Sequence, residues 1–282
     1  MQTDRRLLAS NGRLAHVSLR GQIEAARFVE GDWARVSVAL TDILRQPKGT
    51  RDRQAIWGER FLVLERAGGF AFGQAERDGY VGYVAETDLG PDGRATHWVS
   101  APSSHLYAEP DIKTPEVAAL TMGARLTLVA EVNARFARTD QGLFALRPHL
   151  RAIGDWARDP VGVALGFVGS PYLWGGNSRA GLDCSGLVQA SLLACGIACP
   201  GDSDLQCAAL GAALPEAAAL QRGDLLFWRG HVAMAVDAHA LIHAVGHHMA
   251  VVVEPVDEVI ARNLALDAGP VIARKRLIAP PA

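Results

Sequence analysis

The sequence lacks long apolar runs and an excess of charge of either sign. No apolar stretch approaches the ~18 to 20 residues that a membrane-spanning helix needs. The formal net charge is -2, from 28 Lys and Arg against 30 Asp and Glu, and no polybasic run is present. We therefore expect neither a membrane nor a nucleic acid among the partners of this protein.

Cysteine is also scarce, and the four cysteines lack the paired, repeated spacing of a metal site. All four cysteines lie between positions 184 and 207, and no second pair follows Cys195 and Cys199. This pattern indicates neither a zinc site nor a disulfide framework, so we expect no metal and no cofactor. Residues 1–21 lack the apolar stretch of ~7 to 15 residues of a signal peptide. We therefore expect a cytoplasmic protein, in which the four cysteines are reduced thiols.

At 282 residues the chain is long enough for two or three domains. Residues 1–40 are interpreted as a lead-in. Residues 41–90 and 95–150 contain short alternating strands separated by glycine turns, which is typical of small β-barrels. Residues 156–282 show helical patterns first and a run of strands afterwards, which predicts an α+β domain. The expected fold is therefore multi-domain α+β.

A glycine-rich, aromatic loop runs into Asp183-Cys184-Ser185-Gly186, and an apolar-periodic segment follows it. This pattern predicts a helix with Cys184 in its first turn. The positive end of a helix favours a thiolate, which is the nucleophilic form of cysteine. The alternative is a buried structural cysteine, and we prefer that interpretation for the other three, Cys195, Cys199 and Cys207.

Five blocks of sequence between roughly residues 158 and 265 carry a family resemblance. In chain order they are PYLWGG, DCSGLVQ, RGDLLFW, GHVAMAV and LIHA. Together they resemble the catalytic domain of the NlpC/P60 cysteine peptidases, a papain-like family that cuts bacterial cell-wall peptides. The two β blocks look like the bacterial SH3-like domains that often precede this domain. Five blocks in the right order are far more specific than any one of them.

The resemblance implies a catalytic set around Cys184 as the nucleophile. His231 is the candidate base, and His243, on the next predicted strand, would orient it, since antiparallel pairing could bring the two together. Tyr172 matches a tyrosine whose hydroxyl can help to stabilise the oxyanion. For His239, His247 and His248 we prefer a structural or solvent-facing role, and Asp224 is interpreted as a turn residue.

Some relatives with SH3-like domains cut the bond between γ-D-glutamate and a diamino acid in peptides with a free N-terminal L-alanine. The resemblance implies a small murein peptide of this kind as the substrate. Positions that bind it in such relatives match Asp183, Ser185 and Ser203, and by position Glu59 and Tyr80 of the first SH3-like domain. Capping is the alternative role for the first three and does not exclude binding. A place on the barrel surface is the alternative for Glu59 and Tyr80. Gly201 stands where the family commonly has an arginine.

Two other functions remain open at the level of sequence. The same nucleophile and base would serve a papain-like amidase or acyltransferase that acts on another amide or ester. A non-catalytic module that binds the cell wall is the third possibility, against which the intact Cys184, His231 and His243 argue.

Overall fold

The computed structural model describes residues 4–266 and 268–277. The chain divides into two compact units, Met1–Ile153 and Gly154–Ala282. Residues 1–3 of the predicted lead-in, and residues 267 and 278–282 of the predicted α+β domain, lie outside the described residues.

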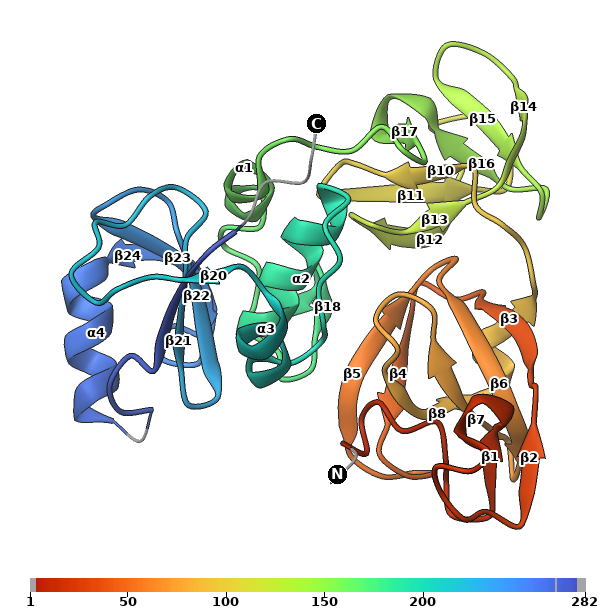
Figure 1. Cartoon of the computed structure of the whole chain (residues 1–282). Helices are drawn as coiled ribbons and strands as arrows, with labels where there is room; N and C mark the ends of the chain where they lie inside the picture. The colour runs from red at the N-terminus through yellow and green to blue at the C-terminus, as the bar shows by residue number, and fades with distance from the viewer. Residues whose placement is uncertain (1–3, 267, 278–282) are drawn as a thin grey trace. The chain divides into compact units, whose positions relative to one another are not determined.

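The N-terminal unit contains a seven-stranded antiparallel sheet, drawn in orange in Figure 1. Its buried residues include Ile43, Phe61 and Val84, which pack into one apolar core. The strands, in spatial order, are β5 (Arg51–Ile56), β4 (Leu40–Leu44), β8 (Val81–Ala85), β7 (Phe70–Ala75), β6 (Arg60–Ala67), β3 (Asp32–Val36) and β9 (Leu89–Pro91).

This sheet begins earlier than the sequence predicts. Strand β3 lies within the segment interpreted as a lead-in, yet it pairs with β6 and β9. Before it, β1 (Leu14–His16) and β2 (Arg27–Val29) form a small parallel pair. Because β3 pairs with residues at least 25 positions away along the chain, no local pattern could assign it to the sheet.

The rest of the N-terminal unit is built from shorter strands around a second core, which includes Leu106, Leu120 and Ala145. A five-stranded sheet has the order β12 (Glu116–Thr121), β11 (Ser103–Tyr107), β16 (Phe144–Leu146), β15 (Phe136–Thr139) and β14 (Leu128–Glu131). A three-stranded sheet consists of β13 (Arg125–Leu126), β10 (His97–Val99) and β17 (Leu150–Ala152). Single 3-10 turns are η1 (Val17–Leu19), η2 (Glu86–Asp88) and η3 (Arg147–His149).

The predicted closure into barrels is not confirmed. Every sheet in the described part of the chain has two separate edge strands, so none closes on itself. Strand patterns in a sequence predict where strands lie, whereas closure depends on pairing between the first and last strands of a sheet.

The C-terminal unit combines four helices with a six-stranded antiparallel sheet. The sheet order is β20 (Ala212–Ala213), β25 (Ala273–Arg276), β21 (Leu225–Trp228), β22 (His231–Ala235), β23 (Ala240–Val245) and β24 (Ala250–Pro255). The helices are α1 (Pro160–Leu165), α2 (Cys184–Ala194), α3 (Ser203–Ala209) and α4 (Val256–Ala265). A short hairpin, β18 (Asn177–Ser178) and β19 (Gly181–Leu182), precedes α2.

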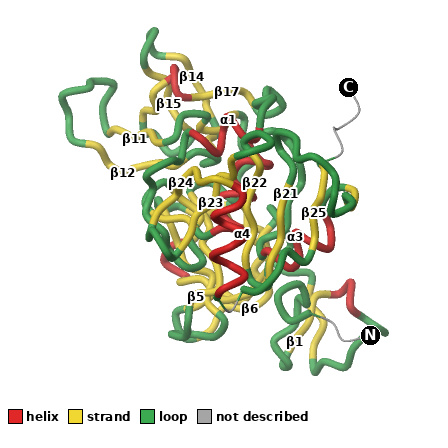
Figure 2. The backbone as a smooth tube through the Cα atoms, turned by 90° about the vertical axis from the view of Figure 1, so that its left-hand side faces the viewer, coloured by secondary structure: helices red, strands yellow, loops and turns green. Residues whose placement is uncertain are grey.

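Helices cover both faces of this sheet, with α4 on one side and α2 and α3 on the other (Figures 1 and 2). Helix α4 buries Val256, Val259 and Asn263, which recur at a spacing of three and four residues and so share one face. The first two pack on a core that includes Trp228 and Leu241. The predicted order of this region, helices first and a run of strands afterwards, and the predicted helix that begins near Cys184 agree with these elements, whereas α3 was not predicted.

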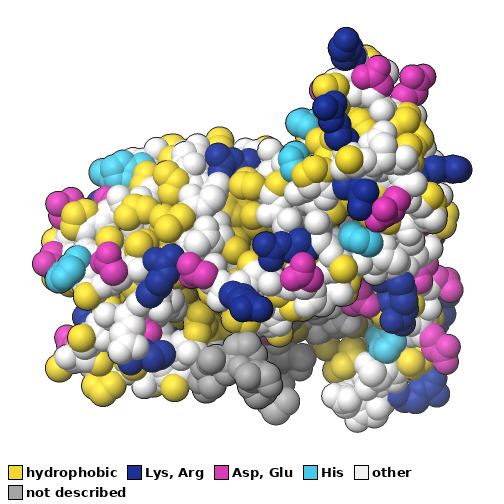
Figure 3. Space-filling model, turned by 90° about the horizontal axis from the view of Figure 1, so that it is seen from above, with side chains coloured by type: hydrophobic (Ala, Val, Ile, Leu, Met, Phe, Trp, Pro, Cys, Tyr) yellow, Lys and Arg dark blue, Asp and Glu magenta, His cyan; other side chains and the backbone are white. Residues whose placement is uncertain are grey.

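Acidic and basic side chains are interspersed on the face shown in Figure 3. This mixture agrees with the formal net charge of -2. Among the helices of the described residues, none is long and apolar enough to cross a membrane.

The tight turn between β5 and β6 contacts the second β block of the same unit. Gly58 has a φ of +77°, and a Cβ at this position would lie 1.9 Å from the Arg125 backbone oxygen. The Arg125 N-H also donates to the oxygen of Trp57, at 2.9 Å. Only glycine permits both the left-handed backbone and this close approach.

We expect Gly58→Ala to destabilise the protein much more than Gly12→Ala. Gly12 also has a left-handed backbone, with a φ of +83°, but no atom lies within 4 Å of a Cβ built there. Both changes carry the strain of that backbone, about 1 kcal/mol, and only Gly58→Ala adds the overlap, about 1 to 3 kcal/mol more. Thermal unfolding of the two full-length variants measures the difference, and equal shifts in Tm would contradict the assigned contact.

Candidate active site

Helix α2 begins at Cys184, and Asp183 caps it. The Asp183 backbone is extended, and its Oδ1 accepts a hydrogen bond from the Gly186 N-H at 2.6 Å. The predicted position of Cys184 in the first helical turn is thereby confirmed. Amide N-H groups and the positive end of the helix dipole lie beside its thiol and favour the thiolate.

The glycine-rich loop packs directly against this first turn. A Cβ on Gly186 would lie 2.3 Å from the Gly176 backbone oxygen, so the loop and helix can approach this closely only with glycine. The second carboxylate oxygen of Asp183 accepts from the Gly175 N-H at 2.9 Å. Asp183 therefore fastens the loop and the helix to each other.

Helix α3 holds the first turn of α2 from another side. The fully buried Gln206 donates from Nε2 to the backbone oxygens of Ser185, at 2.9 Å, and Pro200, at 3.0 Å. Sequence analysis missed this residue, because α3 itself was not predicted. A glutamine facing inward from a short helix is recognisable only once that helix is in place.

The thiol of Cys184 lies against the start of β22. Its side chain is buried, and Sγ is 4.0 Å from the backbone oxygen of Gly230, the residue that precedes His231. Helix α2 packs on β22 and β23. The predicted nucleophile and the predicted base thus come from elements in direct contact.

The rings of His231 and His243 are hydrogen-bonded. Nε2 of His231 lies 2.8 Å from Nδ1 of His243, and the rings meet at 61°. Strands β22 and β23 pair antiparallel, with Met234 opposite Ile242, which brings the two positions near each other. The aromatic ring of Trp228 packs on His231 with centroids 5.7 Å apart.

Sequence analysis missed a carboxylate that hydrogen-bonds to His243. Oε2 of Glu254, on β24, lies 2.7 Å from Nε2 of His243. It also accepts from both terminal nitrogens of Arg262, at 2.6 and 2.7 Å, and lies 3.0 Å from Nε2 of His248. No motif marks Glu254, whose nearness to His243 follows from the pairing of β23 with β24.

Burial keeps both histidines uncharged, whereas hydrogen bonds keep the carboxylate of Glu254 charged. Desolvation, with a smaller contribution from His243, lowers the pKa of His231 to about 3. Desolvation also lowers the pKa of His243, although Glu254 opposes the shift. Burial would raise the pKa of Glu254, but hydrogen bonds from Arg262 and the histidines outweigh it and hold that pKa well below its usual value.

Tyr172 lies near the nucleophile, half-buried in the loop before α2. Burial, together with the nearby Cys184 and Asp183, raises the pKa of Tyr172 to about 12. Its hydroxyl is therefore protonated at neutral pH and can donate a hydrogen bond.

The other predicted substrate contacts occupy two different parts of the chain. Ser185 lies in the first turn of α2 and donates to Asp183 at 3.0 Å, whereas Ser203 is the first residue of α3. In the N-terminal unit, Glu59 is buried and its carboxylate accepts from Arg77 at 2.7 and 2.9 Å. Tyr80 is buried in the first β core. Their roles in substrate binding stay predictions.

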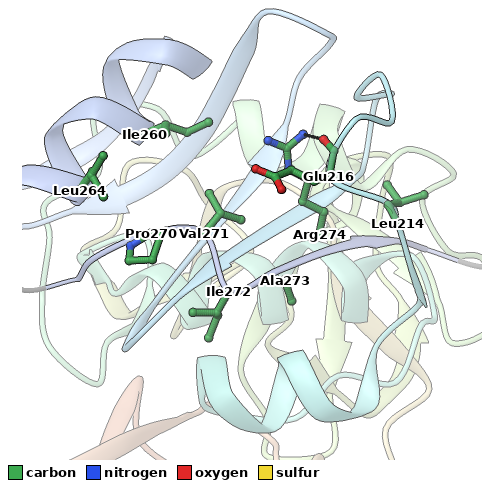
Figure 4. A pocket seen from close by; sticks show the side chains of 9 residues that line it. All are labelled: Leu214, Glu216, Ile260, Leu264, Pro270, Val271, Ile272, Ala273 and Arg274. Carbon is green, nitrogen blue, oxygen red and sulfur yellow. Dashed lines mark hydrogen bonds between the residues drawn. The ribbon is translucent and has the colours of Figure 1, made fainter.

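Two cavities lie in the C-terminal unit near the sheet. One of about 310 Å³ is lined by His231, Arg229, Val245 and Asn263, among others, and so adjoins the candidate base. The other, of about 560 Å³, lies between α4 and the chain that leads into β25, where Arg274 donates to the Glu216 backbone oxygen (Figure 4). No predicted site residue lines the second cavity.

Among the residues that the structure describes, no group of three or more His, Cys, Asp or Glu side chains has an arrangement that could hold a metal ion.

We expect the stability of the protein to fall as the pH drops below about 6.5. An unfolded histidine titrates near pH 6.5 and an unfolded glutamate near 4.3, whereas His231, His243 and Glu254 have lower pKa values when folded. The unfolded state therefore binds more protons on acidification, which favours unfolding. Thermal unfolding of the full chain between pH 7.5 and 4.5 tests this expectation. His243→Gln should flatten the fall between pH 6.5 and 5, and an unchanged pH dependence would refute the assignment.

Two segments of the chain match known protein families. Residues 169–267 match the NlpC/P60 family, and residues 43–89 match the bacterial dipeptidyl-peptidase SH3 domain. A dipeptidyl-peptidase 6 of Lysinibacillus sphaericus is 37% identical over 86 residues, which cover 30% of this chain and 31% of the relative. The chain thus spans about a third of the length of that relative.

Two longer matches extend over both units. A γ-D-glutamyl-L-lysine dipeptidyl-peptidase of Bacillus subtilis is 28% identical over 222 residues, or 68% of this chain and 71% of the relative. The crystal structure of an NlpC/P60 family protein from Bacillus cereus matches with a TM-score of 0.74 at 20% identity, covering 88% of this chain and all of that one, and shows a shared fold. The chain therefore carries an NlpC/P60 domain that follows a bacterial SH3 domain.

Proposed function

We propose that this protein is a cysteine peptidase that hydrolyses the γ-D-glutamyl–diamino acid bond of short murein peptides with a free N-terminal L-alanine. The observation that carries the proposal is the meeting of the capped α2 terminus, with Cys184, and the hydrogen-bonded pair of His231 and His243. The relative named γ-D-glutamyl-L-lysine dipeptidyl-peptidase supports the choice of bond.

In the proposed reaction, the Cys184 thiol gives its proton to His231 and its sulfur attacks the γ-carbonyl carbon of D-glutamate. Neutral imidazole is the form that can accept this proton, which agrees with the lowered pKa of His231. The Cys184 N-H and the protonated Tyr172 hydroxyl would stabilise the oxyanion. His231 then protonates the departing amine of the diamino acid, and water hydrolyses the thioester that remains.

The substrate's free ammonium group needs a buried negative partner, because an unpaired buried charge is costly. We assign this role to Asp183, with Ser185 of α2 and Ser203 of α3 as further contacts. The family resemblance would add Glu59 and Tyr80 from residues 41–90. Because the structure engages Asp183 as a helix cap, this carboxylate would bind the ammonium in addition to its present partners.

The domain interpretation belongs to the same proposal. Of the predicted lead-in, residues 1–40, strand β3 would belong with the first of two SH3-like domains, predicted at residues 41–90 and 95–150, and residues 156–282 would form a papain-like peptidase domain. The SH3-like domains would restrict access to short peptides, and the reaction would take place in the cytoplasm on wall peptides that are being recycled.

We expect Cys184→Ala to abolish hydrolysis of L-Ala-γ-D-Glu-diaminopimelate while leaving the fold intact, since alanine is tolerated at a helix start. His231→Ala should cost about as much, because the members of such a set act as a unit. Release of diaminopimelate, or of lysine from the lysine peptide, is the measurement.

Cys195→Ala is the matched control for this experiment. Cys195 caps the other end of α2, and burial raises the pKa of its thiol to about 11, so it is a poor nucleophile. Its variant should keep full activity. Full activity in folded Cys184→Ala would reject Cys184 as the nucleophile and with it the proposed cysteine peptidase. Cleavage of other amides in preference to these peptides would favour the broader amidase.

Acetylation of the substrate's N-terminus should lower kcat/KM by roughly two or more powers of ten, because it removes the ammonium charge. Asp183→Asn should cause a similar loss while retaining a side-chain oxygen that can cap α2. The two losses should not add, since each removes the same ion pair. Equal cleavage of free and acetylated peptides by the wild type would refute this specificity.

A further inference from the structure

A row of hydrogen-bonded polar groups extends from the candidate base across the sheet to α4. It begins at His231, passes through His243 and Glu254, and ends at Arg262, with successive nitrogen–nitrogen or nitrogen–oxygen distances of 2.6 to 2.8 Å. His243 is 1% exposed and Glu254 9% exposed, so these contacts are shielded from water. Buried hydrogen bonds are stronger and more directional than exposed ones.

The chemistry of these groups sets where each proton lies. An ionised carboxylate can only accept, so Nε2 of His243 must donate to Glu254. Since the lowered pKa of His243 keeps its ring neutral, its Nδ1 then has no proton and accepts from Nε2 of His231. His231 is therefore left with an unprotonated Nδ1, which is the nitrogen that can take a proton from a thiol.

We propose that Glu254, held by Arg262, is a positioning residue of the peptidase, whose charge selects the tautomers of both histidines and stabilises His231 once it has accepted a proton. The inference rests on the proposed function. It adds a carboxylate behind the histidine pair, so that the negative charge acts on the base through a neutral ring.

Arg262 explains how the carboxylate stays in place. Its two terminal nitrogens bind both oxygens of Glu254, and this fork geometry fixes the plane of the carboxylate. His248, from the turn between β23 and β24, also faces Glu254, and Glu258 of α4 interacts with Arg262. Because His248 is exposed and Arg262 is half-buried, the arginine provides the stronger restraint.

The decisive variant is Glu254→Gln, which keeps the shape of the side chain and removes its charge. Without the charge, protonated His231 is less stable and a smaller fraction of Cys184 is thiolate. We expect kcat on the murein peptide to fall on the order of 10-fold to 100-fold with KM changed less than about twofold. Alkylation of Cys184 by iodoacetamide, followed by peptide mass spectrometry, should slow at pH 7 and shift its pH dependence toward that of an ordinary thiol, near pH 8.5.

Asp224→Asn is the matched control. Asp224 is also buried, and it also binds an arginine through two nitrogens, since Arg276 donates to its two oxygens at 2.9 and 2.8 Å. It lies in the turn before β21 of the same sheet, where its carboxylate accepts hydrogen bonds from the Gln221 N-H and from Arg276. Any loss of stability from breaking a buried ion pair should appear in both variants, whereas the change in Cys184 alkylation should appear only in Glu254→Gln.

Two results would overturn the proposal. One is wild-type alkylation and kcat in folded Glu254→Gln, and the other is an equal effect of Asp224→Asn. Should Glu254→Gln not fold, Arg262→Gln replaces it and should shift alkylation in the same direction by a smaller factor. Alkylation needs no substrate, so it tests the role of Glu254 separately from the proposed substrate. If the wild type leaves murein peptides intact while Glu254→Gln still shows the expected shift in alkylation, the proposed substrate is refuted and the role of Glu254 is supported.

Discussion

The organisation of the site depends on the restraint of the first turn of α2. Asp183 binds the Gly186 N-H on the helix and the Gly175 N-H in the loop, while Gln206 holds the backbone of Ser185 from α3. A thiol at a helix terminus benefits from the dipole only while that terminus keeps its position. The close contact between Gly176 and Gly186 leaves no room for a side chain, so the loop and the helix are set as one piece.

The sheet presents a different physical problem, because it buries polar groups. Two histidines, a glutamate and an arginine lie on or against β22, β23, β24 and α4, and each would be costly to bury alone. Their hydrogen bonds satisfy one another in a row, and Arg262 balances the charge of Glu254. Removing one member would leave its neighbour unpaired, which is why single substitutions in this row are expected to alter more than one group.

Much of the C-terminal unit was predictable from local sequence. The run from Leu225 to Pro255 alternates apolar strands with glycine, histidine and aspartate turns, and the strands appear where these patterns place them. The pairing of His231 with His243 followed from antiparallel geometry. Glu254 and Gln206 could not be predicted in this way, because their partners lie on other elements and no spacing along the chain encodes the contacts.

By itself, the sequence determined the helix that carries Cys184 and the strands that carry His231 and His243, because capping residues and apolar periodicity act over a few residues. The resemblance to a known family, which is also a property of the sequence, singled out these three residues as a catalytic set. Tertiary structure alone decided that β3 joins the first sheet, that the sheets of the N-terminal unit stay open, and that Glu254 and Arg262 stand behind the histidine pair. These features depend on which distant segments pack together, and packing is settled by the burial of whole faces of strands and helices.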